Sequence, residues 1–197
     1  MKTSSSREIY QIRVTLTGTR PRIWRRLRVP STLTLTQFHD VLQAAMGWEN
    51  CHLHEFRFGG RAFGPPCPGE GIGNNTLDER NVRLLDILGS GQTNGSYLYD
   101  FGDNWEHELT VEKILQTDTD LLPAECADGE QHAPPEDCGG VCGFYDFLPA
   151  IRDRHHPRHK EMLRWVGRSF NPEAFSVDEV NRTLGALRWE SKKTGDI

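Results

Sequence analysis

Apolar and polar side chains alternate through residues 97–111, on both sides of a Gly-Asp-Asn tripeptide at residues 102–104. Alternation with a period of two is the pattern of β-strands that bury one face. The glycine takes positive φ at no steric cost, and the two residues after it favour turns by bonding their own backbone. The segment therefore predicts two strands joined by a tight turn. Asp100, Asp103 and His107 gather at this turn beside several aromatic residues, which marks it as a candidate site.

The first fifty residues predict a hairpin covered by a helix. Residues 9–16 and 23–29 alternate as strands, and Thr34 begins a helix because Gln37 completes a capping box with it. The helix carries an apolar stripe at helical spacing on Phe38, Val41, Leu42, Ala45 and Met46. Gly47 then ends it in the left-handed conformation that helix C-termini favour. A hairpin with a helix laid across it is a β-grasp-like start to an α+β fold.

The chain as a whole predicts an α+β protein with a mixed, largely antiparallel sheet. Residues 7–116 are expected to form one sheet domain of about five strands and one main helix, with residues 52–58 as the third strand and 59–75 as a loop. A Gly/Pro-rich acidic loop without usable periodicity is expected over 117–143. Short helices are predicted at 82–88, 144–153, 159–166 and 177–187. The last three would form a helical C-terminal part, 144–188, packed on the same domain and followed by a polar tail at 189–197.

Composition restricts the class of protein. No run approaches the roughly 18 apolar residues of a membrane helix, and the polar N-terminus lacks the apolar core of a secretory signal. Five unevenly spaced cysteines argue for a reducing compartment. We therefore expect a cytoplasmic protein without membrane association. The net charge of −5 gives no general reason to expect nucleic-acid binding.

Arginines nevertheless crowd the second predicted strand, at Arg22, Arg25, Arg26 and Arg28. They could form a phosphate-binding groove for a nucleic acid, with Trp24 stacking on a base. The alternative is a solvated face that pairs with the acidic residues of 118–137, with the guanidinium groups stacked on Trp24.

Imidazole and carboxylate groups suggest a site for a divalent metal, the one cofactor that the sequence indicates. His52 and His54 point the same way from one strand, and His107 and Asp103 would join them if the hairpin lies alongside. The alternative is that these histidines are core residues with satisfied hydrogen bonds. For catalysis the candidates are Asp100, Asp103, His107 and Glu136.

Two further patterns allow metal binding. Glu136 and Asp137 precede Gly139-Gly140 and could hold Mg²⁺, or they could cap a helix or pair with arginines. A zinc site could draw on Cys126, Cys138 and Cys142 with Cys67 or His132, although only the second and third have typical ligand spacing. Free cysteines explain that pattern equally well.

Five phrases in order resemble the plasmid pRiA4b ORF-3-like family. They are Pro21-Arg22-Ile23-Trp24-Arg25-Arg26; Met46-Gly47-Trp48 with His52-Leu53-His54-Glu55-Phe56; Tyr99-Asp100-Phe101-Gly102-Asp103-Asn104-Trp105-Glu106-His107; Pro134-Pro135-Glu136-Asp137-Cys138-Gly139-Gly140; and Phe170-Asn171-Pro172-Glu173-Ala174-Phe175. The resemblance implies a compact α+β domain with a helical C-terminal part and an association with plasmids or mobile elements. It implies no particular activity.

These observations favour a binding or adaptor module with a protein or nucleic-acid partner. One alternative is a metal-dependent enzyme that acts on nucleic acid or another phosphoester. The other is a DNA-binding protein that uses the Arg22 to Arg28 strand. Convergence of the acidic and imidazole groups in one cleft would favour the enzyme, and a continuous exposed arginine face would favour DNA binding.

Overall fold

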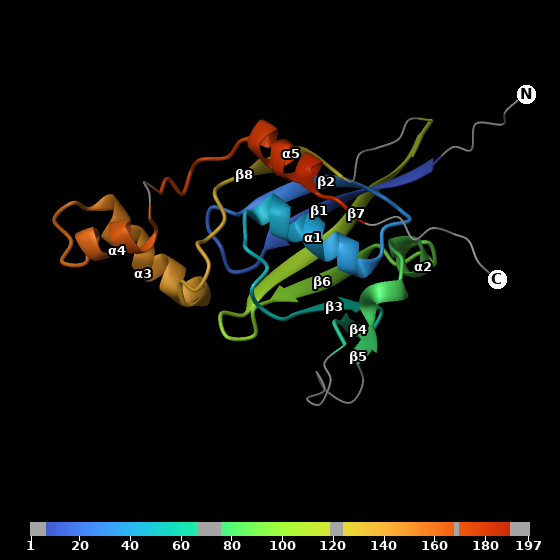
Figure 1. The fold of residues 1–197 in the computed structure, drawn as a ribbon, viewed down its shortest axis with the longest axis horizontal. Coiled ribbons are helices and arrows are strands. Elements are labelled where there is room, and N and C mark those ends of the chain that lie inside the picture. The colour runs from blue at the N-terminus through green and yellow to red at the C-terminus, as the bar shows by residue number, and fades with distance from the viewer. Residues whose placement is uncertain (1–6, 67–75, 119–123, 168–169, 190–197) are drawn as a thin grey trace, which may run out of the picture.

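Eight strands form one mixed sheet in the computed structural model, which describes residues 7–66, 76–118, 124–167 and 170–189 (Figure 1). The strand order is β5-β4-β3-β6-β7-β1-β2-β8, and every printed pair is antiparallel except β4 with β5. The strands are β1 Arg7–Leu16, β2 Trp24–Pro30, β3 His54–Phe58, β4 Arg61–Gly64, β5 Thr76–Asp78, β6 Asn94–Tyr99, β7 Trp105–Thr117 and β8 Glu125–Glu130. This architecture confirms the predicted α+β class.

Five α-helices surround the sheet within the described ranges: α1 Leu35–Met46, α2 Leu84–Leu88, α3 Gly140–Arg152, α4 His159–Trp165 and α5 Val177–Ala186. A 3-10 turn, Glu79–Asn81, precedes α2. Helix α1 lies across one face of the sheet, α5 packs beside it over β8, and α3 and α4 extend past the end of the sheet (Figure 1). In the part of the chain that is described, no helix has both the length and the apolar character needed to cross a bilayer.

Helix α1 forms as its sequence predicts. The Thr34 hydroxyl accepts the Gln37 N–H, and the Gln37 side chain accepts the Thr34 N–H, so the capping box is complete. Gly47 ends the helix with φ of 75°. The predicted apolar stripe is fully buried, because it packs on the sheet.

The number of strands differs from the prediction. The segment 117–143, expected to lack regular structure, contains β8, and the expected loop 59–75 contains β4. The sequence of β8 shows little alternation of apolar and polar residues. The strand is stabilised instead by its pairing with β2 and by its contacts with α5. The Asn181 side chain of α5 bonds both the N–H and the C=O of Cys126 in that strand. Tertiary pairing therefore overrides a weak local pattern here.

The hairpin turn is longer than the predicted tripeptide. Strand β6 ends at Tyr99 and β7 begins at Trp105, so residues 100–104 make the connection. Asp100 and Asn104 both have φ of 57°, and the Asn104 N–H donates to the Asp100 carbonyl at 2.6 Å. Asp and Asn tolerate this left-handed conformation better than other side chains. Because of this conformation, the Asp100 side chain does not continue the alternation of side chains along β6.

Candidate functional site

Three carboxylates converge on one imidazole at the end of the sheet nearest α3. The Nε2 atom of His52 lies 3.0 Å from Asp137 Oδ1 and 3.7 Å from both Asp100 Oδ2 and Glu136 Oε2. This Nε2 atom is buried and makes no hydrogen bond of good geometry within the described structure. We call these four residues the His52 cluster.

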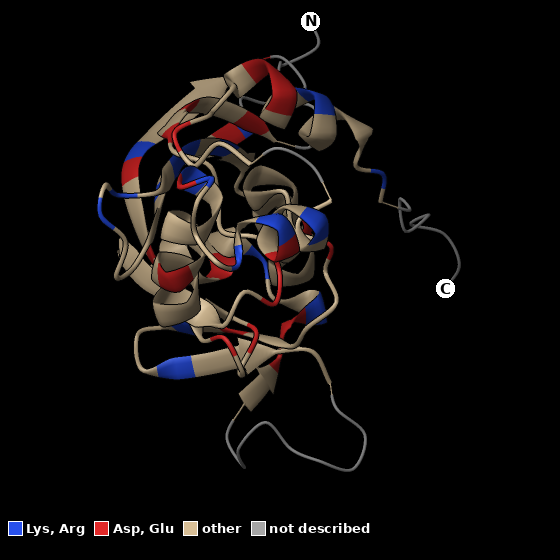
Figure 2. Cartoon of the chain, turned by 90° about the vertical axis from the view of Figure 1, so that its left-hand side faces the viewer, with Lys and Arg blue, Asp and Glu red and all other residues tan. Residues whose placement is uncertain are grey.

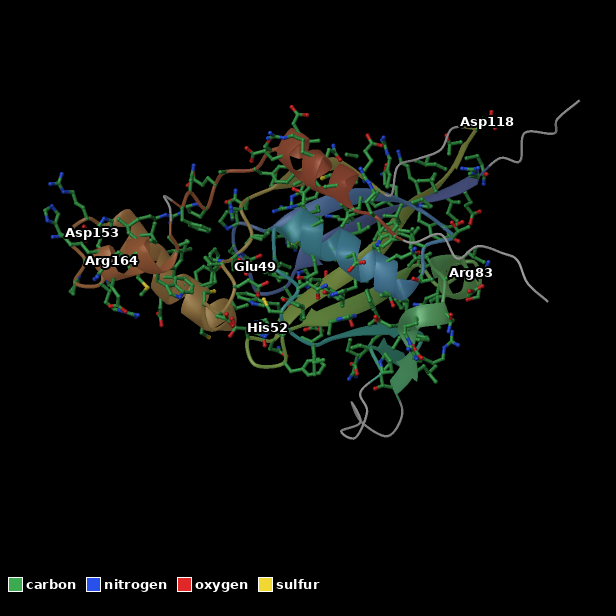
Figure 3. All side chains as sticks on the ribbon, in the orientation of Figure 1. Glu49, His52, Arg83, Asp118, Asp153 and Arg164 are labelled. Atoms are coloured by element: carbon green, nitrogen blue, oxygen red, sulfur yellow. The ribbon has the colours of Figure 1, made fainter. Side chains whose placement is uncertain are left out.

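Strand pairing brings the first two members of the His52 cluster together. His54 at the start of β3 pairs with Tyr99 at the end of β6, and the Asp100 N–H donates to the Leu53 carbonyl. His52 and Asp100 therefore lie just beyond the paired ends of neighbouring strands. Figure 3 shows His52 with Glu49 in the connection between α1 and β3, on the side that faces α3.

The other two members come from the segment between β8 and α3. Glu136 is held by the Glu49 N–H at 2.7 Å and the Tyr99 hydroxyl at 3.1 Å, both donating to its Oε1 atom. Burial and the Glu136 charge raise the pKa of Tyr99, so its hydroxyl remains a donor. The Oε2 atom of Glu136 lies 3.7 Å from His52 Nε2 and also accepts a longer bond, 3.4 Å, from the Tyr99 hydroxyl.

Asp103 fixes this segment to the hairpin turn. Its Oδ2 atom accepts the Gly139 N–H at 3.0 Å. Gly140 follows with φ of 67°, and a Cβ there would overlap the Asp103 carbonyl oxygen. The close approach therefore requires glycine, and Asp103 positions the loop that carries Glu136 and Asp137.

The local charge balance is unusual for a structural cluster. The Asp100 and Glu136 side chains are only 11% and 15% exposed. Within the described ranges, no lysine or arginine makes an ion pair with any of the three carboxylates. Figure 2 shows this end of the molecule facing the viewer, with acidic segments in its loops and basic segments on the helical ribbon beside them. The Asp137 side chain is 67% exposed, so it is the Asp100 and Glu136 charges that are held at low exposure, where a cation stabilises them.

The structure separates His54 from His52. His54 points into the core, where its Nε2 atom lies 2.9 Å from Glu79 Oε2 and its ring stacks on His39 with centroids 3.5 Å apart. The Thr36 hydroxyl bonds the other Glu79 oxygen. We call His39, His54 and Glu79 the buried histidine cluster.

His107 is likewise in the core and outside the His52 cluster. It is fully buried against Trp48 and Tyr97, and its Nδ1 atom donates to the Tyr97 carbonyl at 3.2 Å. Burial lowers its pKa to about 4. The predicted set of His52, His54, Asp103 and His107 is thus not brought to one point, and only His52 faces the converging oxygens.

The arginine strand mostly pairs with acidic neighbours. Arg26 bonds Glu112 and Asp128, and Arg28 lies 3.3 Å from Glu125. Arg25 is 3% exposed and bonds main-chain carbonyls, including that of Ala45. Trp24 is covered by the Arg13 and Arg26 guanidinium groups, and Arg22 is exposed.

The cysteines do not form the expected zinc set within the described structure. The two clusters of potential ligands there join Cys51, His52 and Glu136, or His52, Asp100 and Asp137, and include neither Cys126, Cys138 nor Cys142. Cys67 lies outside the described residues. Desolvation and the carboxylates of Glu136, Glu49 and Asp137 raise the pKa of the Cys51 thiol.

Comparison with known proteins now gives the family. A model of the family described as plasmid pRiA4b ORF-3-like protein matches residues 8–179. The chain belongs to this family. It is 38% identical over 194 residues to the uncharacterised protein y4hQ of Sinorhizobium fredii (strain NBRC 101917 / NGR234), covering 93% of this chain and 95% of that one. It is also similar to the crystal structure of MM3350, a protein of unknown function from Methanosarcina mazei Go1, with a TM-score of 0.79 and 31% identity over 90% of this chain and 98% of that one.

Three of the five phrases that indicated the pRiA4b ORF-3-like family supply the His52 cluster: the phrase with His52, the hairpin phrase with Asp100, and the Glu136-Asp137 phrase. The strand predicted over 52–58 begins only at His54, so His52 precedes β3. The sequence places Asp100 and Glu136 together among the catalytic candidates, and it predicts that the hairpin turn, the His52/His54 strand and the Glu136–Gly140 loop share one surface. It did not indicate Cys51 as a neighbour, because nothing in the sequence places residues 51 and 136 side by side.

Proposed function

We propose that this protein is a binding module that holds a divalent metal ion in the His52 cluster. The observation that carries the proposal is the spacing of carboxylate oxygens around His52 Nε2. The potential ligand atoms form two groups that share His52, one with Asp100 and Asp137 and the other with Cys51 and Glu136. Bonds of about 2.0–2.2 Å to one metal place neighbouring ligand atoms roughly 3 to 3.5 Å apart. The distances of 3.0–3.7 Å from His52 Nε2 to the three carboxylates are close to that range.

The type of ligand narrows the class of metal. One imidazole nitrogen with three carboxylate oxygens suits Mn²⁺, Fe²⁺ or Zn²⁺, while Mg²⁺ prefers oxygen alone. The Tyr99 and Glu49 bonds to Glu136 are the outer contacts that orient a ligand carboxylate. A divalent ion would also offset three negative charges that a single imidazole cannot neutralise.

Metal binding by the full-length protein tests the proposal. After treatment with a chelator, titration with Mn²⁺ and Zn²⁺ is expected to show one equivalent bound, measured by calorimetry and elemental analysis. His52→Ala is expected to weaken binding by about 100-fold, because it removes the central ligand. His155→Ala, an exposed histidine between α3 and α4, is the matched control and should bind like the wild type. Wild type without stoichiometric metal, or His52→Ala with wild-type affinity, would refute the site.

The other hypotheses receive less support from the geometry. DNA binding through β2 would need free arginines, whereas Arg25 is buried and Arg26 and Arg28 are paired with acids. An enzyme acting on phosphoesters would need positive charge beside the metal. The family description names a plasmid, which supports the association with plasmids.

A further inference from the structure

A cavity of about 610 Å³ opens next to the His52 cluster. Its walls come from the end of α1, the loop that carries Glu136 and Asp137, and the end of α4 with the residues after it. We call it the Trp165 cavity. Glu136 and Asp137 belong both to its lining and to the His52 cluster.

One side of the Trp165 cavity is aromatic. Trp48, Trp165 and Phe170 line it. The Trp48 indole donates to the Pro134 carbonyl at 2.9 Å, and Trp165 packs its ring edge-to-face with Phe147 at 5.6 Å. These contacts orient both indoles, yet Trp165 remains 44% exposed. A large aromatic ring fixed beside a cavity and left partly open to solvent is typical of a ligand-binding wall.

The other side of the Trp165 cavity is acidic. Glu49, Glu136 and Asp137 line it, and among the described lining residues there is no lysine or arginine. Glu49 is exposed and contributes to neither group of converging ligand atoms. A phosphate or carboxylate ligand would be repelled by these charges, whereas a cation would be attracted by them.

We infer that the Trp165 cavity binds a small organic cation whose apolar body packs on the aromatic wall and whose ammonium group faces Glu49. The inference deepens the proposed function by naming the class of ligand held beside the metal. The inference rests on the proposed function in one respect: the Trp165 cavity and the His52 cluster share Glu136 and Asp137.

Three ligands of nearly equal shape test the inference: 2-phenylethylamine, 2-phenylethanol and phenylacetate, which are cationic, neutral and anionic at pH 7. Each is titrated into the full-length, metal-free protein by calorimetry, with ligand-observed NMR for weak binding. We expect the amine to bind about 10-fold more tightly than the alcohol, and phenylacetate to bind most weakly.

Variants assign the effect to the two walls. Trp165→Leu should weaken both the amine and the alcohol by about 10-fold, because it removes the ring on which their apolar bodies pack. Glu49→Gln should weaken the amine and leave the alcohol unchanged. Ile114→Ala, an exposed apolar residue on β7 outside the cavity, is the control and should bind like the wild type.

The outcomes separate the two claims. Equal binding of amine and alcohol, preference for phenylacetate, or no binding of any of the three would overturn this inference. Trp165→Leu and Glu49→Gln should both retain the metal equivalent that His52→Ala loses. Preference for the amine without metal binding would overturn the proposed function alone, and metal binding without this preference would overturn the inference alone.

Discussion

Two clusters of imidazole and carboxylate groups lie on either side of the start of β3, and they differ in how their polar atoms are used. In the buried histidine cluster each ring is enclosed. The Nε2–H of His39 donates to Asn50 Oδ1 at 2.7 Å, and its Nδ1 accepts from the Tyr97 hydroxyl at 2.8 Å. Glu79 receives bonds on both oxygens, from His54 and Thr36.

In the His52 cluster the polar atoms face one another without completing such a network. The His52 Nε2 atom has three carboxylates around it and no hydrogen bond of good geometry in the described structure. Main-chain N–H groups donate hydrogen bonds to Asp100 Oδ1 and Glu136 Oε1, and the Tyr99 hydroxyl also donates to Glu136 Oε1. These bonds fix the positions of the two carboxylates.

The difference shows how closely related sequence signals separate into a structural and a functional role. Buried polar groups stabilise a fold when every donor and acceptor has a partner. Groups that converge while some of their donor or acceptor atoms lack a partner are suited to binding a ligand. Accordingly, variants of the buried cluster should change stability and leave metal affinity intact, while variants of the His52 cluster should do the reverse.

The largest effect is expected for Glu79→Ala. It removes one partner of a buried pair and leaves His54 without its carboxylate, which should lower the free energy of unfolding by about 3 to 5 kcal/mol. Urea denaturation measures the loss, and metal titration below the transition should show wild-type affinity. Glu136→Ala is the counterpart, with a loss of about 1 kcal/mol in the free energy of unfolding and a metal affinity lowered by about 10- to 100-fold. Equal destabilisation by Glu79→Ala and Glu136→Ala would contradict the division into a structural cluster and a metal-binding cluster.

A smaller effect is expected for Gly140→Ala. Positive φ and overlap with the Asp103 carbonyl should together cost about 2 to 3 kcal/mol and move Glu136 and Asp137 away from His52. Gly60→Ala is the matched control, since Gly60 has φ of 77° and open space around its Cβ direction. It should cost about 1 kcal/mol and leave metal affinity unchanged. Thermal unfolding and metal titration of both variants test this, and unaltered metal affinity in Gly140→Ala would contradict it.

Taken per pH unit, the smallest effect is that of acid on stability. Burial and the neighbouring His54 lower the pKa of His39 to about 3, from the 6.5 of an exposed histidine. Between these values the unfolded chain binds a proton at this residue and the folded chain does not, so stability falls as the pH falls from about 6.5. The contribution is at most about 1.4 kcal/mol per pH unit.

Denaturation of wild type and His39→Gln at pH 7, 6, 5 and 4 measures this contribution. The variant should start less stable and lose less with acid over the same interval. Parallel pH profiles would show that His39 carries no such proton linkage.

Local patterns in the sequence were sufficient for most individual elements. Thr34, Gln37 and Gly47 predicted α1 with its caps, and alternation through 97–111 predicted the β6–β7 hairpin. The five phrases predicted the family, because they run in order through nearly the whole matched region. These features depend on residues a few positions apart, whose geometry is set by the backbone itself.

The sequence predicted that the hairpin turn, the His52/His54 strand and the Glu136–Gly140 loop share a surface, and tertiary structure decided which of their side chains meet. Strand β8 forms because β2 and the Asn181 side chain bond its main chain. The same pairing places Asp128 beside Arg26 and Glu125 beside Arg28, so both arginines form ion pairs. His52 and His54 lie two residues apart, yet β3 begins between them, so one ring enters the core and the other joins Asp100, Glu136 and Asp137. The reason is physical: the distance between residues 52 and 136 depends on how strands and loops pack, and periodicity along the chain carries no information about that packing.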